Sequence, residues 1–268
     1  MDSWTGMVTE TGMEIRILGA HNCESSTSKF ASLLIDDVLA IDAGGLTSSL
    51  SFEAQQKLKA VLLTHQHYDH IRDIPALAMN LFLRGSTITV YSIQPTYEAV
   101  SSCLLDGKLY PRFMEQPEQE PTIRFTVLEP YRTEYVGGYS ILPVPVTHSV
   151  AAVGYLVTSP DGKVLFYTGD TGPGLIECWR HVSPQLLVIE VTAPSTYGEF
   201  ARQSGHLTPS LLERELISFR ELKGYLPRVV LVHMNPDLES EIAGEVAALA
   251  RTLDCPVVLA TEGMRLHL

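Results

Sequence analysis

The sequence predicts an α/β fold in which two β-sheets pack face to face with helices on both flanks, a four-layer αββα sandwich. Short β-forming runs recur from one end of the 268-residue chain to the other. Helical patterns occur between the later runs. No stretch rich in Gly, Ser or Pro is long enough for a linker, so we expect residues 1–268 to form a single domain.

The expected strands are short runs rich in Val, Ile, Leu and aromatic residues. Turn-forming residues separate two pairs of them, Asp36-Asp37 in one case and Pro160-Asp161-Gly162 in the other, and both positions predict hairpins. The strands are expected at 14–18, 31–35, 38–41, 60–63, 87–91, 123–128, 140–146, 153–158, 163–167, 186–191, 229–232 and 257–260.

Two apolar stripes at helical spacing predict helices in the carboxyl-terminal third. The first follows Thr208, which can cap a helix, and Pro209, which suits the first turn. The second begins after Asp237, a plausible cap. Both stripes are expected to face the core. Their apolar residues are Leu212, Leu216 and Phe219 in the first and Leu238, Ile242, Val246, Leu249 and Leu253 in the second.

The acidic composition argues against a long nucleic acid as partner. The formal net charge is −12 with a pI near 5.1, and no window concentrates Lys and Arg. A small anionic substrate is compatible with this charge, because bound cations would dominate the local field.

A soluble, cytoplasmic protein is expected. No apolar run approaches the length of a bilayer span, so we expect no membrane association. Residues 1–6 lack the basic and apolar regions of a secretory leader. The cysteines, at positions 23, 103, 178 and 255, lie far apart without a Cys-x-x-Cys pair, which predicts free thiols in a reducing compartment.

The segment Thr64-His65-Gln66-His67-Tyr68-Asp69-His70 is the strongest functional signal. It directly follows the apolar run 60–63, so its side chains should project from the end of a buried strand. His65 and His67 can fall on one side, and a following turn can bring Asp69 and His70 toward the same point. Nitrogen and carboxylate ligands suit zinc, manganese or iron better than calcium or magnesium.

Further candidate ligands stand where other predicted strands stop. His148 follows 140–146, Asp170 follows 163–167 and His233 follows 229–232. Rigid strands that lead into polar loops commonly position functional side chains, so we expect these residues to converge on the first cluster.

In this order, the His-x-His-x-Asp-His run, the later His, the Gly-Asp-Thr and the final His resemble the metallo-β-lactamase-fold hydrolases. Segments 168–172, 190–192 and 204–209 are similar to the class II cyclic-nucleotide phosphodiesterases and, more distantly, to ribonuclease Z. Asp42-Ala43-Gly44-Gly45 resembles the short turn that precedes the metal motif in those families, whereas the phosphodiesterase pattern usually has Leu where this chain has Tyr68.

The resemblance implies two divalent ions per chain, with zinc the first expectation and manganese or iron as alternatives. A bridging carboxylate would bind both ions, which would share a hydroxide that attacks the substrate. One ion would be held by His65, His67 and His148, the other by Asp69, His70 and His233, and both by Asp170.

His206, in Gly205-His206-Leu207-Thr208, is our candidate for protonating the leaving oxygen, and Glu190 could orient its imidazole. A simpler interpretation is a solvated His in the turn before a helix. We also expect Asp69 to act in catalysis, and Thr171 to contact the substrate together with His206.

The leading functional hypothesis is a phosphodiesterase for a cyclic nucleotide or another small phosphodiester. A ribonuclease Z-like nuclease is the nearest alternative, but only 22 positions separate His148 from Asp170, where bacterial ribonuclease Z is expected to carry a long arm. Hydrolysis of a thioester or lactone stays open, because the same hydroxide can attack a carbonyl carbon. An iron-containing oxygen or nitric oxide reductase is a further alternative. Such proteins typically have Glu at the position of His67, which counts against this function. A homodimer is the default expectation for the assembly.

Overall fold

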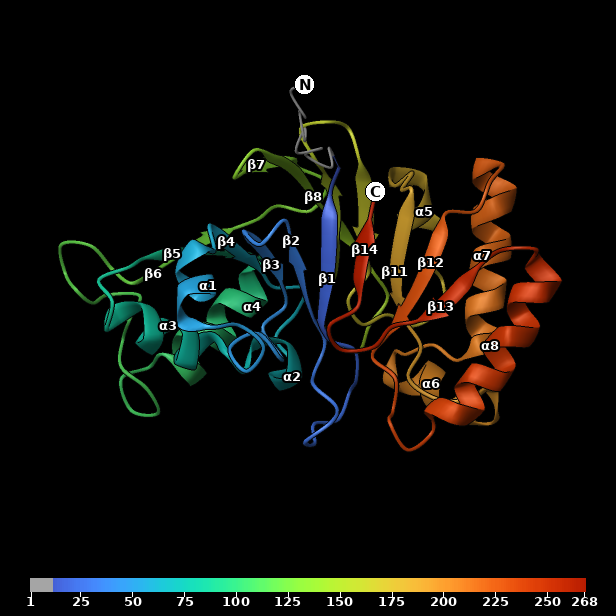
Figure 1. Ribbon diagram of the computed structural model, residues 1–268, viewed down its shortest axis with the longest axis horizontal. Helices are drawn as coiled ribbons and strands as arrows, with labels where there is room; N and C mark the ends of the chain where they lie inside the picture. The colour runs from blue at the N-terminus through green and yellow to red at the C-terminus, as the bar shows by residue number, and fades with distance from the viewer. Residues whose placement is uncertain (1–11) are drawn as a thin grey trace, which may run out of the picture.

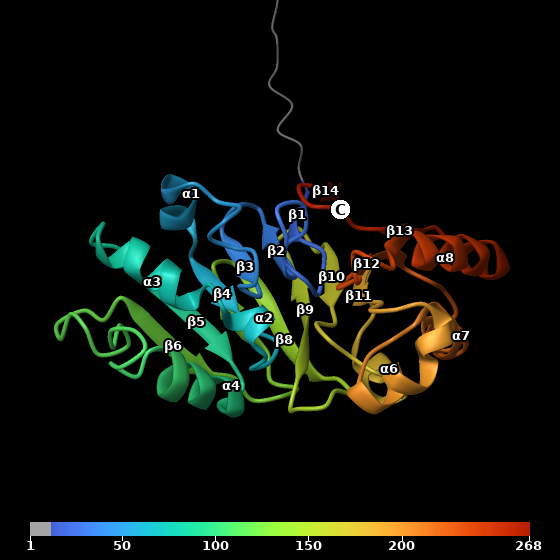
Figure 2. The same ribbon diagram turned by 90° about the horizontal axis from the view of Figure 1, so that it is seen from below.

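Two β-sheets form the centre of the protein, with helices on the outer side of each (Figure 1). The computed structural model describes residues 12–268. The amino-terminal segment, on which the expectation of no leader sequence rests, lies outside the described residues. Figure 2 shows the two layers of strands from below, with α1 and α3 on one side and α7 and α8 on the other.

The first sheet has seven strands and is formed mainly by the amino-terminal half of the chain. Strands β1 to β3 pair antiparallel, β3 to β6 pair parallel, and β14 returns from the carboxyl terminus to pair antiparallel with β1. In spatial order the strands are β14 (Arg265–His267), β1 (Glu14–Gly19), β2 (Ser32–Ile35), β3 (Leu39–Ile41), β4 (Ala60–Leu62), β5 (Ile88–Ser92) and β6 (Ile123–Val127).

The second sheet also has seven strands. Strands β7 to β10 form an antiparallel meander, and β10 to β13 pair parallel. In spatial order the strands are β13 (Val257–Leu259), β12 (Arg228–Val232), β11 (Leu186–Glu190), β10 (Val164–Tyr167), β9 (Val153–Thr158), β8 (Tyr139–Pro145) and β7 (Glu134–Val136).

Helices cover the outer faces of both sheets (Figure 1). Among residues 12–268, none of them combines the length and apolarity that a bilayer crossing needs. They are α1 (Phe52–Lys57), α2 (Tyr68–Ile71), α3 (Ile74–Phe82), α4 (Gln94–Ala99), the π-helical turn η1 (Val100–Leu104), α5 (Ile176–His181), the 3₁₀ turn η2 (Ser195–Tyr197), α6 (Gly198–Ser204), α7 (Pro209–Lys223) and α8 (Glu239–Leu253).

The structure confirms the twelve strands expected from the sequence to within a residue or so at each end, together with both hairpins. At the first hairpin, Asp36 and Asp37 both have positive φ, as the tight turns that join antiparallel strands often require. The sequence predicted neither β7 nor β14, each of three residues, nor any helix other than α7 and α8.

The structure also confirms α7 and corrects the start of α8. Pro209 occupies the first turn of α7, and Gly224 ends that helix in the left-handed conformation. Asp237 was expected to cap α8, but the helix begins at Glu239 with Leu238 as the cap residue. The expectation was wrong because the Asp237 backbone N–H is held by Asn235 Oδ1, which makes Asp237 part of the preceding turn.

Strand β2 shows why many strand sequences are apolar at successive positions and do not alternate with polar residues. Leu33 and Ile35 belong to the core between the two sheets, whereas Leu34 points into a second core beneath the helices of the first half. A strand buried on both faces has no polar side, which is typical of a sheet inside a layered fold.

The strand directions bring several strand ends to one edge. In the second sheet, β10, β11 and β12 are parallel, and β8 runs with β10 because each pairs antiparallel with β9. In the first sheet, β3 and β4 are parallel. The loop after β4 reaches the second sheet through a hydrogen bond from Val153 N to Thr64 O of 3.1 Å. The polar residues that follow these strands therefore meet.

His21 joins three segments that are distant in the sequence. Its imidazole is 5% exposed and lies between Glu262, 2.7 Å from Nδ1, and Glu239, 3.2 Å from Nε2. Glu262 Oε1 also accepts from Lys29 N at 2.9 Å. The hydrogen bond to Glu262 raises the pKa of His21. Burial opposes the charged form of Glu262, but the hydrogen bond from His21 lowers its pKa.

We expect His21→Gln to destabilise the fold by about 1–3 kcal/mol near pH 5.5, because it removes a charged hydrogen-bond donor between two carboxylates. A raised His pKa stabilises the fold below the unfolded value of about 6.5, and this contribution disappears as the pH rises through the folded value. The lowered Glu262 pKa adds stability that is lost as the pH falls below about 4.3. Urea unfolding at several pH values measures the difference.

The matched control is His181→Gln, whose side chain is 40% exposed and 3.5 Å from Glu177. It should change stability by less than about 0.5 kcal/mol. A cost for His21→Gln that stays constant from acidic to alkaline pH would contradict the charged pairing.

Candidate metal centre

The loop after β4 supplies four of the polar side chains at the shared edge. His65 and His67 lie in the loop, and Asp69 and His70 lie in the first turn of α2, which begins directly after His67. The backbone is held by hydrogen bonds from His70 N to His67 O of 3.0 Å and from Ala43 N to His70 O of 2.7 Å. Helix α2 is therefore the turn that was expected to bring Asp69 and His70 back toward His65 and His67.

Gly44 allows the Asp42–Gly45 turn to lie against this loop. A Cβ atom on Gly44 would lie 2.1 Å from the backbone oxygen of Asp69, closer than any side chain can approach. The turn that resembles the family pattern thus has a steric reason for glycine: it lets the two loops touch.

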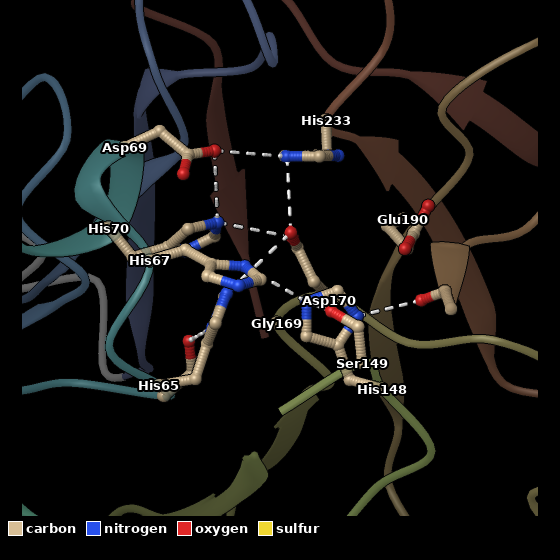
Figure 3. A network of polar contacts seen from close by, with 12 residues as sticks. His65, His67, Asp69, His70, His148, Ser149, Gly169, Asp170, Glu190 and His233 are labelled. Atoms are coloured by element: carbon tan, nitrogen blue, oxygen red, sulfur yellow. Dashed lines mark hydrogen bonds and ion pairs between the residues drawn. The ribbon is translucent and has the colours of Figure 1, made fainter. Parts of the chain in front are cut away.

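The first group of potential ligands consists of His65, His67, His148 and Asp170, each with a donor atom within 4.8 Å of the others (Figure 3). His148 Nδ1–H donates to Gly205 O at 2.8 Å, so the Nε2 of the neutral ring carries a lone pair. This Nε2 lies 3.1 Å from His67 Nδ1. Two ring nitrogens that face each other at this distance need a proton or a cation between them.

The second group consists of Asp69, His70, Asp170 and His233. His233 Nε2 lies 3.3 Å from both Asp69 Oδ2 and Asp170 Oδ2, and His70 Nε2 lies 3.2 Å from Asp170 Oδ1. Asp170 belongs to both groups and lies between them in Figure 3. Asp170 Oδ2 also lies 3.8 Å from His65 Nε2 of the first group, so the carboxylate faces imidazoles of both groups, as a bridging carboxylate must.

The pKa shifts of most of these side chains favour metal binding. Burial and the neighbouring His70 hold the pKa of His65 well below its usual value, and burial also lowers the pKa of His67 and His148. Burial alone would raise the pKa of Asp69 and Asp170, but the surrounding His70 and His233 reverse this and lower both. Burial alone would lower the pKa of His70, but Asp170, Asp42 and Asp69 outweigh it and raise the pKa, so a cation would displace a proton from that ring. Neutral imidazoles beside ionised carboxylates are the forms that bind cations.

Unsatisfied polar atoms test whether these residues fit a metal. His65 Nε2, His70 Nε2 and Asp170 Oδ1 are buried and make no hydrogen bond among the described residues. Leaving buried polar atoms without partners costs free energy, and native proteins rarely do so without a reason. All three atoms point into the two groups, so the residues present fit divalent cations with nitrogen and oxygen ligands.

Glu190 and His206 form a separate unit beside the second group. Glu190 is fully buried, and its Oε1 accepts from His206 Nδ1 at 2.7 Å. Burial would lower the pKa of His206, but the Glu190 carboxylate outweighs it and raises the pKa to about 9. Because the Glu190 oxygens also accept from Thr171 N, Thr192 Oγ1 and Leu207 N, they have little capacity left for a metal.

Gly205 lets His206 approach the metal ligands. It ends α6 with φ of +77°, and a Cβ there would lie 2.7 Å from Ser149 N and 3.1 Å from the His148 backbone. Both the left-handed conformation and the close contact require glycine. The His206 ring stacks on the His233 ring with centroids 5.3 Å apart.

The structure places Thr171 differently from the expectation. It is fully buried, and its hydroxyl lies 3.2 Å from the backbone oxygen of Thr147 and 3.1 Å from that of Gly172, either of which can accept its one proton. The side chain does not line the adjacent pocket, so the structure lends no support to the expected contact with the substrate, which stays a prediction. Instead, its backbone N–H donates to Glu190 Oε1 at 2.9 Å and helps to hold the carboxylate.

An open pocket of about 400 Å³ lies over Asp69, Asp170, His206 and His233. Residues that the sequence reading did not select also line it, among them Asn22, Phe30 and Tyr68. The pocket is large enough for a small organic substrate. Tyr68 was visible within the metal motif, but its 63% exposed side chain had no pattern that indicated a role in the pocket.

The structure brings together all seven residues expected to bind metal, and it places Glu190 beside His206. It therefore shows a site that can hold cations, whereas the role of each ligand stays a prediction. Sequence reasoning missed Thr192, which joins Glu190 to His233 through its hydroxyl, and it noted Asp42 only as part of a turn, although Asp42 accepts from His70 Nδ1 at 2.7 Å.

Comparisons with known proteins agree with this geometry. The chain is 22% identical over 209 residues to the "Probable 3',5'-cyclic-nucleotide phosphodiesterase" of Yersinia pestis, which covers 69% of this chain and 59% of that protein. It is 29% identical over 135 residues to the "Ribonuclease Z" of Thermococcus kodakarensis, covering 48% and 40%. The matched regions thus span about half the length of these relatives.

A solved structure and a family model support the fold. The structure of unliganded yeast PDE1 superimposes with a TM-score of 0.82 at 18% identity, covering 96% of this chain and 99% of that one. A family model described as "Beta-lactamase superfamily domain" matches residues 33–234, which include every residue of the two potential ligand groups. The chain therefore belongs to the β-lactamase superfamily domain family and has the metallo-β-lactamase fold.

Proposed function

We propose that this protein is a dinuclear-metal phosphodiesterase that hydrolyses a cyclic nucleotide or another small phosphodiester. The observation that carries the proposal is the shared position of Asp170 between two potential ligand groups, with the His206 imidazole on the adjoining wall of the same pocket. Two divalent cations held there would activate a water molecule and offset the negative charge of a phosphodiester.

His206 is the proposed donor of a proton to the leaving oxygen. Its Nδ1–H donates to Glu190, so the proton available to a substrate is the one on Nε2. In hydrolysis a water molecule loses one proton to solvent, its oxygen forms a bond to phosphorus, and a P–O bond to the sugar breaks. The leaving oxygen then takes the Nε2 proton, while Glu190 stabilises the charged ring until that transfer.

The shape and charge of the site favour a small substrate over a long nucleic acid. The pocket has a volume of about 400 Å³, and the interval between His148 and Asp170 contains only β9, β10 and their hairpin turn. The net charge of −12 would repel a polyanion along its length.

Association as a homodimer stays a separate prediction, for which sedimentation velocity is the direct measurement.

The function is tested by incubating zinc- or manganese-loaded protein with bis-(p-nitrophenyl) phosphate, cyclic AMP, cyclic GMP, a cyclic dinucleotide and a thioester in parallel. We expect turnover of at least one small phosphodiester, and we expect no retardation of transfer RNA in a gel at moderate salt. Turnover of the thioester alone would replace the proposal with a thioester hydrolase. Tight transfer RNA binding with cleavage would replace it with a ribonuclease Z-like enzyme.

Metal content should depend on Asp170 more than on any single histidine. We expect about two equivalents of zinc in the dialysed wild type, because two-metal hydrolytic sites share bridging ligands. Asp170→Asn should reduce both equivalents, since it weakens both groups, whereas His148→Ala should reduce one. Plasma mass spectrometry gives the stoichiometry, with His181→Gln as a control outside the site. Two equivalents in Asp170→Asn would exclude a bridging role.

His206→Ala should lower turnover by about 10²- to 10⁴-fold on a substrate with a poor leaving group. The loss should be much smaller for bis-(p-nitrophenyl) phosphate, because a nitrophenolate leaves without protonation. A sugar oxygen, as in cyclic AMP, needs the proton. Steady-state rates on both substrates, with metal content measured in parallel, give the comparison. Equal losses on the two substrates, or loss of metal, would argue against a general acid.

A further inference from the structure

Two threonine hydroxyls lie between buried carboxylates and imidazoles of the candidate metal centre. We propose that Thr64 and Thr192 are positioning residues that relay hydrogen bonds from Asp42 and Glu190, and thereby fix the tautomers of His65 and His233 with Nε2 free to bind a cation. The inference rests on the proposed metal site and adds a role for two residues that touch neither metal nor substrate.

The first relay runs from Asp42 to His65. The Thr64 hydroxyl lies 3.0 Å from each oxygen of the Asp42 carboxylate and 3.0 Å from His65 Nδ1. All three residues are completely buried, so water cannot replace any of these contacts. The Thr64 backbone N–H also donates to Asp42 Oδ1 at 2.8 Å, which fixes the threonine against the carboxylate.

The second relay runs from Glu190 to His233. The Thr192 hydroxyl lies 2.8 Å from Glu190 Oε2 and 2.9 Å from His233 Nδ1. His206 Nδ1 lies 3.3 Å from the same hydroxyl, but it is only 2.7 Å from Glu190 Oε1 and therefore donates to the carboxylate. Thr192 is 9% exposed. The two relays come from different sheets and share no residue.

The number of available protons sets the direction of each relay. An ionised carboxylate can only accept, and a threonine hydroxyl has one proton to donate. Once that proton goes to the carboxylate, the hydroxyl can only accept from the imidazole. Nδ1 must then carry the ring proton, and the Nε2 of a neutral ring keeps its lone pair.

The environment of His65 Nε2 agrees with this direction, and that of His233 Nε2 is compatible with it. His65 Nε2 is buried with no hydrogen-bond partner among the described residues, so a proton on it would have no acceptor. His233 Nε2 faces Asp69 Oδ2 and Asp170 Oδ2, each at 3.3 Å. Without a metal, His233 Nε2 can carry a second proton that these carboxylates accept, and a shared cation would replace that proton. The relays thus direct both lone pairs toward the potential ligand groups.

Each carboxylate also contacts another imidazole directly. Asp42 accepts from His70 Nδ1 at 2.7 Å, and Glu190 accepts from His206 Nδ1 at 2.7 Å. One carboxylate therefore orients one ring by direct contact and a second ring through a hydroxyl. On the Glu190 side, this joins the candidate proton donor to a candidate metal ligand.

The test replaces each hydroxyl with a methyl group of similar size. Thr192→Val and Thr64→Val should weaken zinc binding by about 10- to 100-fold in competition with a chromophoric chelator, the usual effect of losing an outer hydrogen bond to a ligand. Thr192→Ser should restore affinity, because it returns the hydroxyl. The matched control is Thr96→Val, since the Thr96 hydroxyl is also buried but makes no hydrogen bond among the described residues. It should bind zinc like the wild type.

A second measurement reads the tautomers without metal or turnover. Long-range ¹H–¹⁵N spectra of metal-free protein with ¹⁵N-labelled histidine should show His65 and His233 protonated at Nδ1. Thr192→Val should reduce protonation of His233 at Nδ1 and leave His65 unchanged, and Thr64→Val should do the reverse. A wild-type ring without a proton on Nδ1 would overturn the relay, even if a valine variant fails to fold.

The two proposals fail in distinguishable ways. If the wild type binds no zinc, the proposed function fails while the spectra still test the relay. If the wild type binds zinc and both folded valine variants bind it equally well, the relay fails while the proposed function stands.

Discussion

Burial of two carboxylates at the meeting point of the sheets is the constraint on which the rest of the site depends. Asp42 and Glu190 are both inaccessible to water, so each must be surrounded by hydrogen-bond donors to keep its charge. Asp42 accepts hydrogen bonds from Thr64, His70 and Tyr167, and Glu190 accepts them from residues of three separate loops. The donors that satisfy these charges include side chains that orient the candidate ligands.

Strand direction explains why the ligands converge. A parallel arrangement places the carboxyl ends of β10, β11 and β12 side by side, and the polar residues after them leave the sheet at the same edge. The loop after β4 approaches from the other sheet and completes the two groups around Asp170. Helix α2 contributes two ligands within one turn, which a more extended loop could not bring back so sharply.

Much of the fold could be predicted because the spacing of apolar residues within a strand or helix is a local property of the sequence. Twelve strands, two hairpins and the apolar stripes of α7 and α8 follow from patterns that each element carries by itself. Strands β7 and β14 were missed because three residues are too few to show a period. The start of α8 was misplaced because the side chain of Asn235, two positions earlier, holds the Asp237 backbone.

The sequence by itself determined which residue types stand at the strand ends, and hence the seven candidate ligands and the His206–Glu190 pair. Only the tertiary structure decided how they are held, because hydrogen-bond partners come from segments far apart in the chain. It buried Thr171, which sequence reasoning had placed against the substrate, and it put the Thr192 hydroxyl between Glu190 and His233. A sequence pattern can identify a candidate side chain. Which of two atoms donates a hydrogen bond and which accepts it depends on the groups that pack around them.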